Sequence, residues 1–414
     1  MESRERLLDL YLDPALLARQ EARYADAVKE FEALFGPGDY EIFSAPGRSE
    51  IGGNHTDHQH GKVLACSLNL DIIGVVRKTD DNVIRLKSAG YNQTDVNLSV
   101  LTPVEEETDH SPSLIRGVAA ALKDKGYEIG GFEAYTTNDV LSGGGMSSSA
   151  AFEIFVGTVL NGLYNNMEID PVTLAIAAQR AENEFFGKPS GLLDQMACSV
   201  GGLITVDFMN PKEPVLRKLD VDFGAFGHKL CITDTKGSHA DLTDEYAAVP
   251  GEMKAVAKAL GKEVLRDVDR NIFYHSIPQL RRSLGDRPVL RAMHFFDENQ
   301  RVDDEVRALE TGNFDEFLRL INASGNSSYK YLQNVYSNRK RNDQAIPVAL
   351  AVSERVLGGR GACRVHGGGF AGTIQAFVPD DLVGNYRKTM DGIFGEGACH
   401  VLNVRKYGGL KVFE

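Results

Sequence analysis

The sequence has few cysteines, and they are not arranged in pairs. Five cysteines are scattered over 414 residues, and no two of them are spaced as Cys-x-x-Cys. A disulfide framework and a structural zinc site both need cysteines in regular groups, so the sequence predicts neither. This cysteine usage is typical of a reducing compartment, and we expect a cytoplasmic protein.

The sequence also lacks a long apolar run and an excess of basic residues. No stretch reaches the ~18 apolar residues of a membrane-spanning helix, and the charged N-terminus has no apolar signal-peptide core. The 58 acidic residues outnumber the 45 basic ones, which gives a net charge of −13. Nucleic acid and anionic membranes are therefore not expected partners.

The length and the composition predict a globular protein of two packed domains. Hydrophobic residues make up 43% of the 414 positions and charged residues 25%, which is ordinary for a folded chain. Strands and helices do not alternate regularly, which favours an α+β fold over a doubly wound sheet. A β-rich stretch begins near residue 203, so we expect one domain over 1–205 and another over 206–414. Helices are predicted over 4–35, 114–122, 148–166, 171–186 and most of 250–357.

A glycine- and serine-rich stretch from Ser142 to Ala151 reads Ser-Gly-Gly-Gly-Met-Ser-Ser-Ser-Ala-Ala. Glycines let a ligand approach the backbone closely, and a helix that starts after them presents unpaired amides and a partial positive charge. The pattern therefore suits a phosphate, and a flexible turn with a serine cap is the alternative. No lysine follows the glycines, so the stretch is not a Walker A loop.

A second glycine-rich stretch, Gly367-Gly-Gly-Phe-Ala-Gly372, formally matches the dinucleotide fingerprint GxGxxG. That fingerprint needs a helix after the glycines, whereas residues 373–378 have the pattern of a strand. We therefore expect a tight connection between two strands here.

The stretch from Gly47 to Gly61 is dense in polar side chains beside a predicted strand. Its polar members are Arg48, Asn54, His55, Asp57, His58 and His60. Such groups suit the hydroxyls of a sugar or a phosphoryl group in transfer. Two alternatives remain, namely a metal site built from the histidines with Asp57, and a plain solvated loop.

Taken together, these three stretches resemble the signature motifs of the GHMP kinase superfamily, and within it those of the galactokinases. Gly47 to Gly61 is similar to GRxNxIGEHTDYxxG, Leu141 to Ala150 to PxGxGLSSSA, and Gly367 to Gly372 to GGGFGG. Their order and separation also match, and the resemblance extends over essentially the whole chain. It implies a two-domain α+β GHMP kinase fold with the active site in the interdomain cleft. It also implies transfer of the γ-phosphoryl group of ATP, with Mg²⁺, to the C1 hydroxyl of galactose.

The resemblance further implies roles for individual residues. Ser190-Gly-Leu-Leu-Asp-Gln195 is similar to the family's CGIMDQ, which makes Asp194 the catalytic base, while Arg48 stabilises charge on the transferring phosphoryl group. The implied sugar-binding positions are Asn54, His55, Thr56, Asp57, Gly191 and Tyr246. The implied ATP-binding positions are Gly143, Gly144, Gly145, Met146, Ser147, Ser148 and Ser149, and the implied magnesium ligands are Ser149 and Glu182.

Elementary physical arguments bear on two of these carboxylates. Asp194 falls in the first turns of a short predicted helix, where the helix dipole stabilises a negative charge. Glu182 and Glu184 lie equally far from the apolar face of their predicted helix, on opposite flanks. Periodicity therefore does not choose between them, and the resemblance selects Glu182.

The sequence departs from the galactokinase pattern at several positions. Asn54 stands where the family has a glutamate that faces the C6 hydroxyl of the sugar, and Glu50 stands where the family has an asparagine. An amide is uncharged and donates as well as accepts hydrogen bonds, so the site could admit an altered or acidic C6 group. His58 replaces the family tyrosine.

Two other functions therefore stay open. One is another sugar-1-kinase of the same superfamily, acting on galacturonate, arabinose or N-acetylgalactosamine. The other is a non-catalytic galactose sensor that acts through a protein partner, which the intact serine run and Asp194 disfavour. As an enzyme, the protein would have a sugar and ATP as its partners, and we expect a monomer or a weak homodimer.

Overall fold

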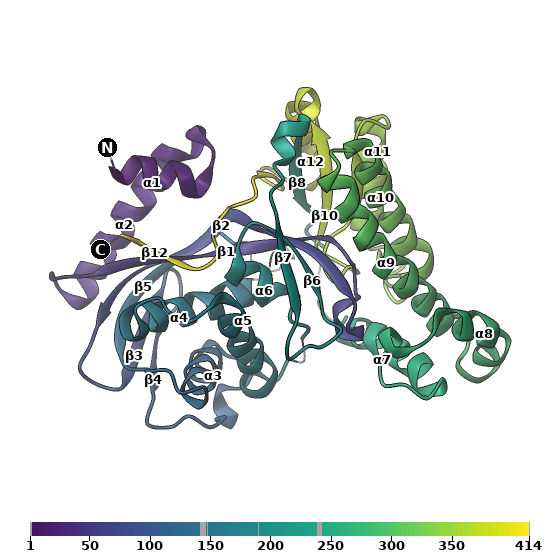
Figure 1. Cartoon of the computed structure of the whole chain (residues 1–414). Helices are drawn as coiled ribbons and strands as arrows, with labels where there is room; N and C mark the ends of the chain where they lie inside the picture. Colours follow the sequence, from purple (N-terminus) through teal and green to yellow (C-terminus); the bar gives the residue numbers. More distant parts are fainter. Residues whose placement is uncertain (1, 141–145, 147, 189, 238–241, 414) are drawn as a thin grey trace.

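Two β-sheets and the helices packed on them organise the chain in a computed structural model (Figure 1). The structure describes residues 2–140, 146, 148–188, 190–237 and 242–413. The larger sheet has eight strands and the smaller has four. Because helices combine with mostly antiparallel strands, the fold is α+β, as the sequence predicts.

The larger sheet is built around its two longest strands, β1 (Glu41–Gly52) and β2 (Lys62–Lys78). The strand order is β12-β1-β2-β5-β3-β4, while β6 pairs with the first part of β2 and β7 pairs with β6. Among the described strands of this sheet, β3 and β5 pair in parallel and the other pairs are antiparallel. The remaining strands are β3 (Val83–Ser88), β4 (Gln93–Asn97), β5 (Phe132–Asn138), β6 (Leu203–Asp207), β7 (Val215–Leu219) and β12 (Leu410–Phe413).

Helices cover both faces of the larger sheet, and successive strand residues face opposite sides. Ile42 and Ile73 belong to the core under α1 (Glu2–Tyr11) and α2 (Leu17–Phe35). Their neighbours Phe43 and Ile72 belong to the core on the other side, with α3 (Ser111–Asp124) and α4 (Ser148–Asn165). This is the two-residue period of strands that are buried on both faces. Helices α5 (Pro171–Arg180) and α6 (Leu193–Val200) pack beside α4 in the second layer (Figure 1).

The smaller sheet has the antiparallel order β11-β8-β10-β9. Its strands are β8 (His228–Asp234), β9 (Ala362–Val365), β10 (Thr373–Pro379) and β11 (Cys399–Leu402). The predicted helical region lies between β8 and β9 and contains α7 (Thr243–Ala259), α8 (Arg270–Leu284), α9 (Asp286–Glu310), α10 (Phe314–Ser327) and α11 (Ala345–Leu357). Helix α12 (Val383–Phe394) follows β10 and packs on this sheet.

The end of β1 connects the two sheets. Gln375 of β10 donates from Nε2 to the carbonyl of Ile51 at 3.1 Å, and the Ser49 hydroxyl and His366 Nε2 are 3.1 Å apart. The expected domain boundary at residue 205 falls inside β6, and the last strand of the chain, β12, returns to pair with β1. We therefore propose that the division follows β7 and that β12 belongs with the N-terminal part.

Local sequence signals explain where most helices and strands begin and end, and one predicted helix differs from the structure. The helix predicted over 4–35 is interrupted, because Leu12 has a φ of 58° and Pro14 starts a separate 3₁₀ turn (Pro14–Leu16) that Asp13 caps. Asp170 caps α5 as predicted, and this helix continues into a π-helical segment, Ala181–Phe186. The connection from β9 to β10 through Gly367 to Gly372 is the tight strand-to-strand link that the sequence predicts.

Within the described ranges, no helix combines the length and the apolar character that crossing a bilayer requires.

Candidate active site

Arg48 and Asp194 form a two-pronged ion pair between β1 and α6. Arg48 Nε lies 2.7 Å from Asp194 Oδ1, and Arg48 Nη2 lies 2.9 Å from Asp194 Oδ2. The arginine side chain is 8% exposed and the aspartate side chain 34%, so the carboxylate is the part of the pair that a ligand can reach. Asp194 lies in the first turn of α6, where the helix dipole stabilises its charge. The planar guanidinium fixes the orientation of the carboxylate.

Asp57 brings a second carboxylate to this ion pair. It starts a short 3₁₀ turn, Asp57–Gln59, in the loop after β1. Gly191 lies so close that a Cβ atom there would be 1.8 Å from Asp57 Oδ2, a separation that only glycine allows. Burial and the neighbouring carboxylates of Asp194 and Glu50 raise the pKa of Asp57 to about 7. Two carboxylates and one guanidinium therefore share a single site.

Three polar side chains anchor this site to the second glycine-rich stretch. Each one bonds to one of the three successive backbone carbonyls of residues 367–369. Asn54 Nδ2 lies 2.8 Å from the Gly367 carbonyl, and His55 Nε2 lies 3.1 Å from that of Gly368. Tyr246 Oη lies 2.8 Å from that of Gly369. His55 and Phe370 have φ values of 57° and 59°, in the left-handed region that costs energy for residues other than glycine. The strand connection thus joins the loop after β1 to α7.

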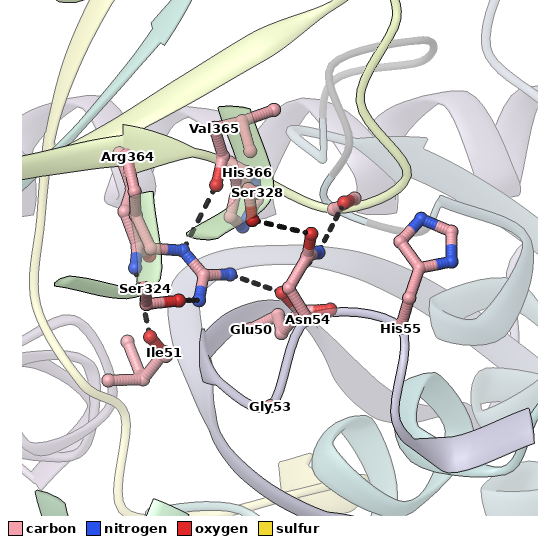
Figure 2. Close-up of polar contacts among 12 residues, drawn as sticks. Glu50, Ile51, Gly53, Asn54, His55, Ser324, Ser328, Arg364, Val365 and His366 are labelled. Carbon is pink, nitrogen blue, oxygen red and sulfur yellow. Dashed lines mark hydrogen bonds and ion pairs between the residues drawn. The ribbon is translucent and has the colours of Figure 1, made fainter. Parts of the chain in front are cut away.

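The Asn54 amide is buried, and its hydrogen-bonding capacity is used within the protein (Figure 2). Nδ2 donates to Glu50 Oε1 and to the Gly367 carbonyl, both at 2.8 Å, while Oδ1 accepts from Asn334 Nδ2 at 3.0 Å and from Ser328 Oγ at 3.2 Å. An amide has two donor hydrogens and two acceptor positions, so a sugar would have to displace one of these partners to bond to it.

Glu50, the partner of Asn54, is itself paired with a buried arginine. Arg364 donates to Glu50 Oε1, and it also bonds to Ser324 Oγ at 3.1 Å and to the Val365 carbonyl at 3.0 Å (Figure 2). The Arg364 side chain is 0% exposed. Glu50, Asn54 and Arg364, which we call the Asn54 cluster, therefore form a closed polar network.

The Thr56 hydroxyl is also buried. It lies 2.8 Å from the Gly53 carbonyl and 2.5 Å from the Lys62 carbonyl, so it closes the loop between β1 and β2. The structure thus places Asn54 and Thr56 among the residues that hold this loop. It places Asp57 and Gly191 at the ion pair, with His55 and Tyr246 on the adjoining strand connection.

A second polar cluster surrounds the carboxylate of Glu182. Ser149 Oγ and Lys188 Nζ lie 3.1 Å and 2.8 Å from Oε1. Ser190 Oγ and Gln195 Nε2 lie 2.6 Å and 2.9 Å from Oε2. Gln195 follows Asp194 in α6, so this cluster adjoins the Arg48–Asp194 pair.

The structure separates Glu182 from Glu184, which periodicity could not do. Glu182 is 2% exposed, whereas Glu184 is exposed and pairs with Arg180 at 2.8 Å. Both lie in the π-helical segment, where the extra residue in the turn breaks the 3.6-residue period.

The oxygens around Glu182 fit a magnesium ion. Hydroxyl and carboxylate oxygens are the ligands that Mg²⁺ prefers, and the Lys188 ammonium already places a positive charge against the same carboxylate. Glu153, one turn after Ser149 on α4, is buried behind this cluster and accepts from Gln195 Nε2 at 3.0 Å. Burial and the charge of Glu182 raise the pKa of Glu153 well above its usual range. Ser149 and Glu182 thus suit the ligand role that the resemblance implies.

Part of the predicted ATP loop lies outside the described residues, namely Gly143, Gly144, Gly145 and Ser147. Of the other members, Met146 is buried, and its carbonyl accepts from the backbone N–H of Arg48 at 3.3 Å. Ser148 and Ser149 open helix α4. The described end of the loop therefore lies beside Arg48, at a helix N-terminus of the kind that binds phosphate.

Known proteins match this chain over most of its length, and two family models match parts of its N-terminal half. The model for the GHMP kinases N terminal domain matches residues 113–202, and the galactokinase galactose-binding signature matches residues 29–78. A galactokinase of Streptomyces coelicolor is 30% identical over 372 residues, which cover 88% of this chain and 92% of that protein. A galactokinase of Glaesserella parasuis is 30% identical over 365 residues, covering 87% and 90%. The chain belongs to the galactokinase family.

Solved structures agree on the fold. The Lactococcus lactis galactokinase complexed with galactose has a TM-score of 0.81 and 24% identity, covering 94% of this chain and 99% of that one. The Methanococcus jannaschii mevalonate kinase has a TM-score of 0.63 and 16% identity, covering 89% and 99%. The predicted GHMP kinase fold is therefore confirmed, and this member of the galactokinase family is a sugar kinase.

The histidines of the loop after β1 do not form a metal site in this galactokinase-family protein. Among the residues with described positions, no group of three or more His, Cys, Asp or Glu side chains could hold a metal ion. His55 Nδ1 and His58 Nε2 instead lie 3.3 Å apart as a hydrogen-bonded pair. Burial lowers the pKa of His55 to about 4, so its ring is neutral at pH 7.

Sequence reasoning gave no role to four residues that the structure places in this site: Glu153, Lys188, Ser190 and Gln195. The spacing of four between Ser149 and Glu153 puts both on one helix face, which was a usable signal. Ser190 and Gln195 lie inside the CGIMDQ-like motif. No sequence pattern indicates a role for Lys188, because the position of its side chain depends on the turn that follows the π-helical segment.

Proposed function

We propose that this protein transfers the γ-phosphoryl group of ATP to the anomeric C1 hydroxyl of galactose, giving galactose 1-phosphate. The observation that supports this most directly is the Arg48–Asp194 pair. Asp57 adds a second carboxylate to it, and Met146, just before α4, is bonded to the Arg48 backbone. The pair combines a carboxylate for the nucleophile with a cation for the phosphoryl group. Phosphoryl transfer needs little more than such positioning and charge stabilisation.

In the proposed reaction, Asp194 accepts the proton of the C1 hydroxyl while the C1 oxygen forms a bond to the γ-phosphorus. The bond between that phosphorus and the bridging oxygen of ADP breaks, and ADP leaves with the electron pair. Arg48 holds the Asp194 carboxylate by two hydrogen bonds. In this proposal its guanidinium would also stabilise charge on the phosphoryl oxygens.

The sugar would bind against Asp57, His55, Gly191 and Tyr246. Asn54 and Thr56 would hold the loop that carries His55 and Asp57, because their side chains bond to the protein. Asn54 was the residue that suggested an acidic or altered C6 group. Since its amide is committed to four protein partners, it gives no support to galacturonate over galactose.

ATP would lie along residues 143–149 and the start of α4, with magnesium held by Ser149 and Glu182. The magnesium ion would neutralise phosphate charge when bound. The remaining expectations belong to this proposal as well: a cytoplasmic protein, a monomer or weak homodimer, and no nucleic-acid or membrane partner.

A panel of sugars assayed with ATP tests the proposal. We expect ADP release and a C1-linked phosphate, detected by phosphorus NMR, with galactose. Turnover should be much lower with galacturonate, arabinose and N-acetylgalactosamine. An absence of galactose turnover together with rapid turnover of one of the other sugars would reassign the substrate. An absence of turnover with every sugar, together with tight galactose binding, would favour a sensor.

A further inference from the structure

Lys188 is the residue of the site whose position the reaction outlined above does not explain. Its ammonium lies 2.8 Å from Glu182 Oε1, the same oxygen that accepts from the Ser149 hydroxyl at 3.1 Å. The Lys188 side chain is 57% exposed, whereas that of Glu182 is 3% exposed. The lysine therefore covers a buried carboxylate from its solvent side.

The backbone holds Lys188 at this position. The π-helical segment ends at Phe186, and Gly187 follows it with a φ of 88°. The Lys188 N–H then donates to the Glu182 carbonyl at 3.0 Å. The main chain and the side chain of Lys188 thus both return to Glu182. A left-handed turn of this kind is accessible mainly to glycine, so Gly187 sets the direction of the lysine.

The buried Glu182 carboxylate needs a positive charge beside it. Glu182 is in direct contact with Lys188, and Glu153 lies behind it, joined to Glu182 through Gln195. Arg48 is already paired with Asp194, so its charge balances that carboxylate and not Glu182. Lys188 is the positive side chain that neutralises the carboxylate of Glu182.

We propose that Lys188 is a resident cation that is exchanged during nucleotide binding. In the nucleotide-free enzyme it occupies the carboxylate oxygen that a magnesium ion would use. When the metal–nucleotide complex arrives, the ammonium moves to a phosphate oxygen of the nucleotide. This inference rests on the metal and ATP positions of the proposed function and adds a residue and an order of events to them.

The chemistry of lysine suits such an exchange. Its ammonium is a compact charge with three donors on a long flexible chain, which binds phosphate as a point charge. The lysine end of the pair is exposed, and an arriving metal ion would take over its charge against the buried Glu182 carboxylate, so the exchange leaves no buried charge unpaired. An arginine with a two-pronged grip, such as that of Arg48 on Asp194, would exchange less readily.

The test compares Lys188→Met with Lys29→Met, which removes the same charge. Lys29 is exposed on α2, which packs on the opposite face of the larger sheet from α4. Binding of Mn²⁺ alone, without nucleotide or sugar, is followed by electron paramagnetic resonance. Lys188→Met should bind Mn²⁺ roughly fivefold more tightly than wild type, the range expected when a half-exposed competing ion pair is removed.

The second measurement is calorimetric binding of Mn²⁺–ADP and Mn²⁺–ATP, again without sugar. Lys188→Met should bind these complexes at least ~10-fold more weakly, because a charged hydrogen bond to phosphate is lost. Lys188→Arg should bind them less tightly than wild type but more tightly than Lys188→Met, because an arginine keeps the charge and exchanges less readily. Lys29→Met should match wild type in both measurements.

Two results would overturn the inference: metal affinity in Lys188→Met equal to that of Lys29→Met, or unchanged nucleotide affinity. Thermal unfolding checks that the variant folds, and Lys188→Gln replaces it if it does not. No sugar is used, so a failed sugar panel and a failed exchange of Lys188 are separate outcomes.

Discussion

Two polar clusters lie along the end of β1, and they differ in how completely their charged and polar groups are paired. In the Asn54 cluster, each donor and acceptor of the Asn54 amide has a protein partner, and Arg364 neutralises Glu50. Around Asp194, by contrast, Asp57 places a second carboxylate beside the Arg48 ion pair, and its pKa rises to about 7.

This difference in hydrogen-bond pairing distinguishes polar residues that stabilise the fold from polar residues that are available to a ligand. A buried network whose groups are all paired makes the structure rigid and specific. Crowded, partly buried carboxylates are unfavourable in the free protein and typical of functional sites. Asn54 therefore has the surroundings of a supporting residue, although its motif suggested a sugar contact, while Asp57 and Asp194 have the surroundings of reacting groups.

The largest expected effect is on Asp194. Asp194→Ala should reduce kcat at saturating ATP and galactose by at least ~10²-fold, the low end for removal of a general base. Asp194→Asn is the matched control, because it keeps the shape beside the buried Arg48. Both variants should still bind ATP in calorimetry. Unchanged turnover in Asp194→Asn would remove Asp194 from the chemistry and leave it as a partner of Arg48.

The next effect concerns the Asn54 cluster, and it is measured as stability. Asn54→Glu places a second carboxylate against Glu50 and the Gly367 carbonyl. Glu50→Asn removes one of the two carboxylates paired with buried Arg364, the other being Glu298. Each change should lower the free energy of unfolding by about 3 kcal/mol, typical for breaking a buried ion pair. Urea unfolding of both variants provides the measurement.

The double exchange Glu50→Asn with Asn54→Glu sharpens this test. It restores a carboxylate–amide pair between the two positions, so we expect a coupling energy of at least about 1 kcal/mol in the double-mutant cycle. Additive losses would show that positions 50 and 54 act independently. A selective change in kcat with unaltered stability would instead move Asn54 into the reacting part of the site.

A pH-dependent effect on stability is expected at Asp57. Its pKa is about 7 in the folded protein against 3.8 as the ordinary value, so the folded state holds the proton more tightly than the unfolded state. The carboxylate therefore costs stability increasingly as pH rises from about 4 to 7, and the full cost remains above 7. The free energy of unfolding of Asp57→Asn, relative to that of wild type, should therefore increase by up to about 1.4 kcal/mol per pH unit within that window.

Thermal unfolding at pH 5, 6, 7 and 8 checks this prediction. The same variant should have a higher KM for galactose, since the amide replaces the carboxylate that, in the proposed function, would face the sugar. A stability difference that is independent of pH would contradict the shifted pKa of Asp57.

The smallest effect is expected at Tyr246. Tyr246→Phe removes the hydrogen bond from Oη to the Gly369 carbonyl and keeps the ring against Phe370, 5.3 Å away between centroids. The loss of one neutral hydrogen bond should lower the free energy of unfolding by about 1 kcal/mol. A rise in galactose KM well beyond this energy would indicate that the hydroxyl also contacts the sugar.

Much of the fold could be predicted from the sequence because it depends on local signals. Asp170-Pro171 starts α5, the glycines of 367–372 join two strands, and Asp194 falls in the first turn of a short helix, as predicted. The interruption at Pro14 and the return of β12 to β1 were not predicted. The first is a local break inside a long apolar pattern, and the second is a pairing between chain ends.

The sequence by itself determined the family, the α+β class and the residue types available for phosphoryl transfer, because motifs and periodicities are properties of neighbouring residues. Only the tertiary structure decided which groups already have partners. It buried Glu182 and exposed Glu184 through a π-helical segment, committed the Asn54 amide to Glu50 and Gly367, and brought Lys188 onto Glu182. Hydrogen bonds are satisfied in space between segments far apart in the chain, so the free and the occupied polar groups of this site emerge only when the chain folds.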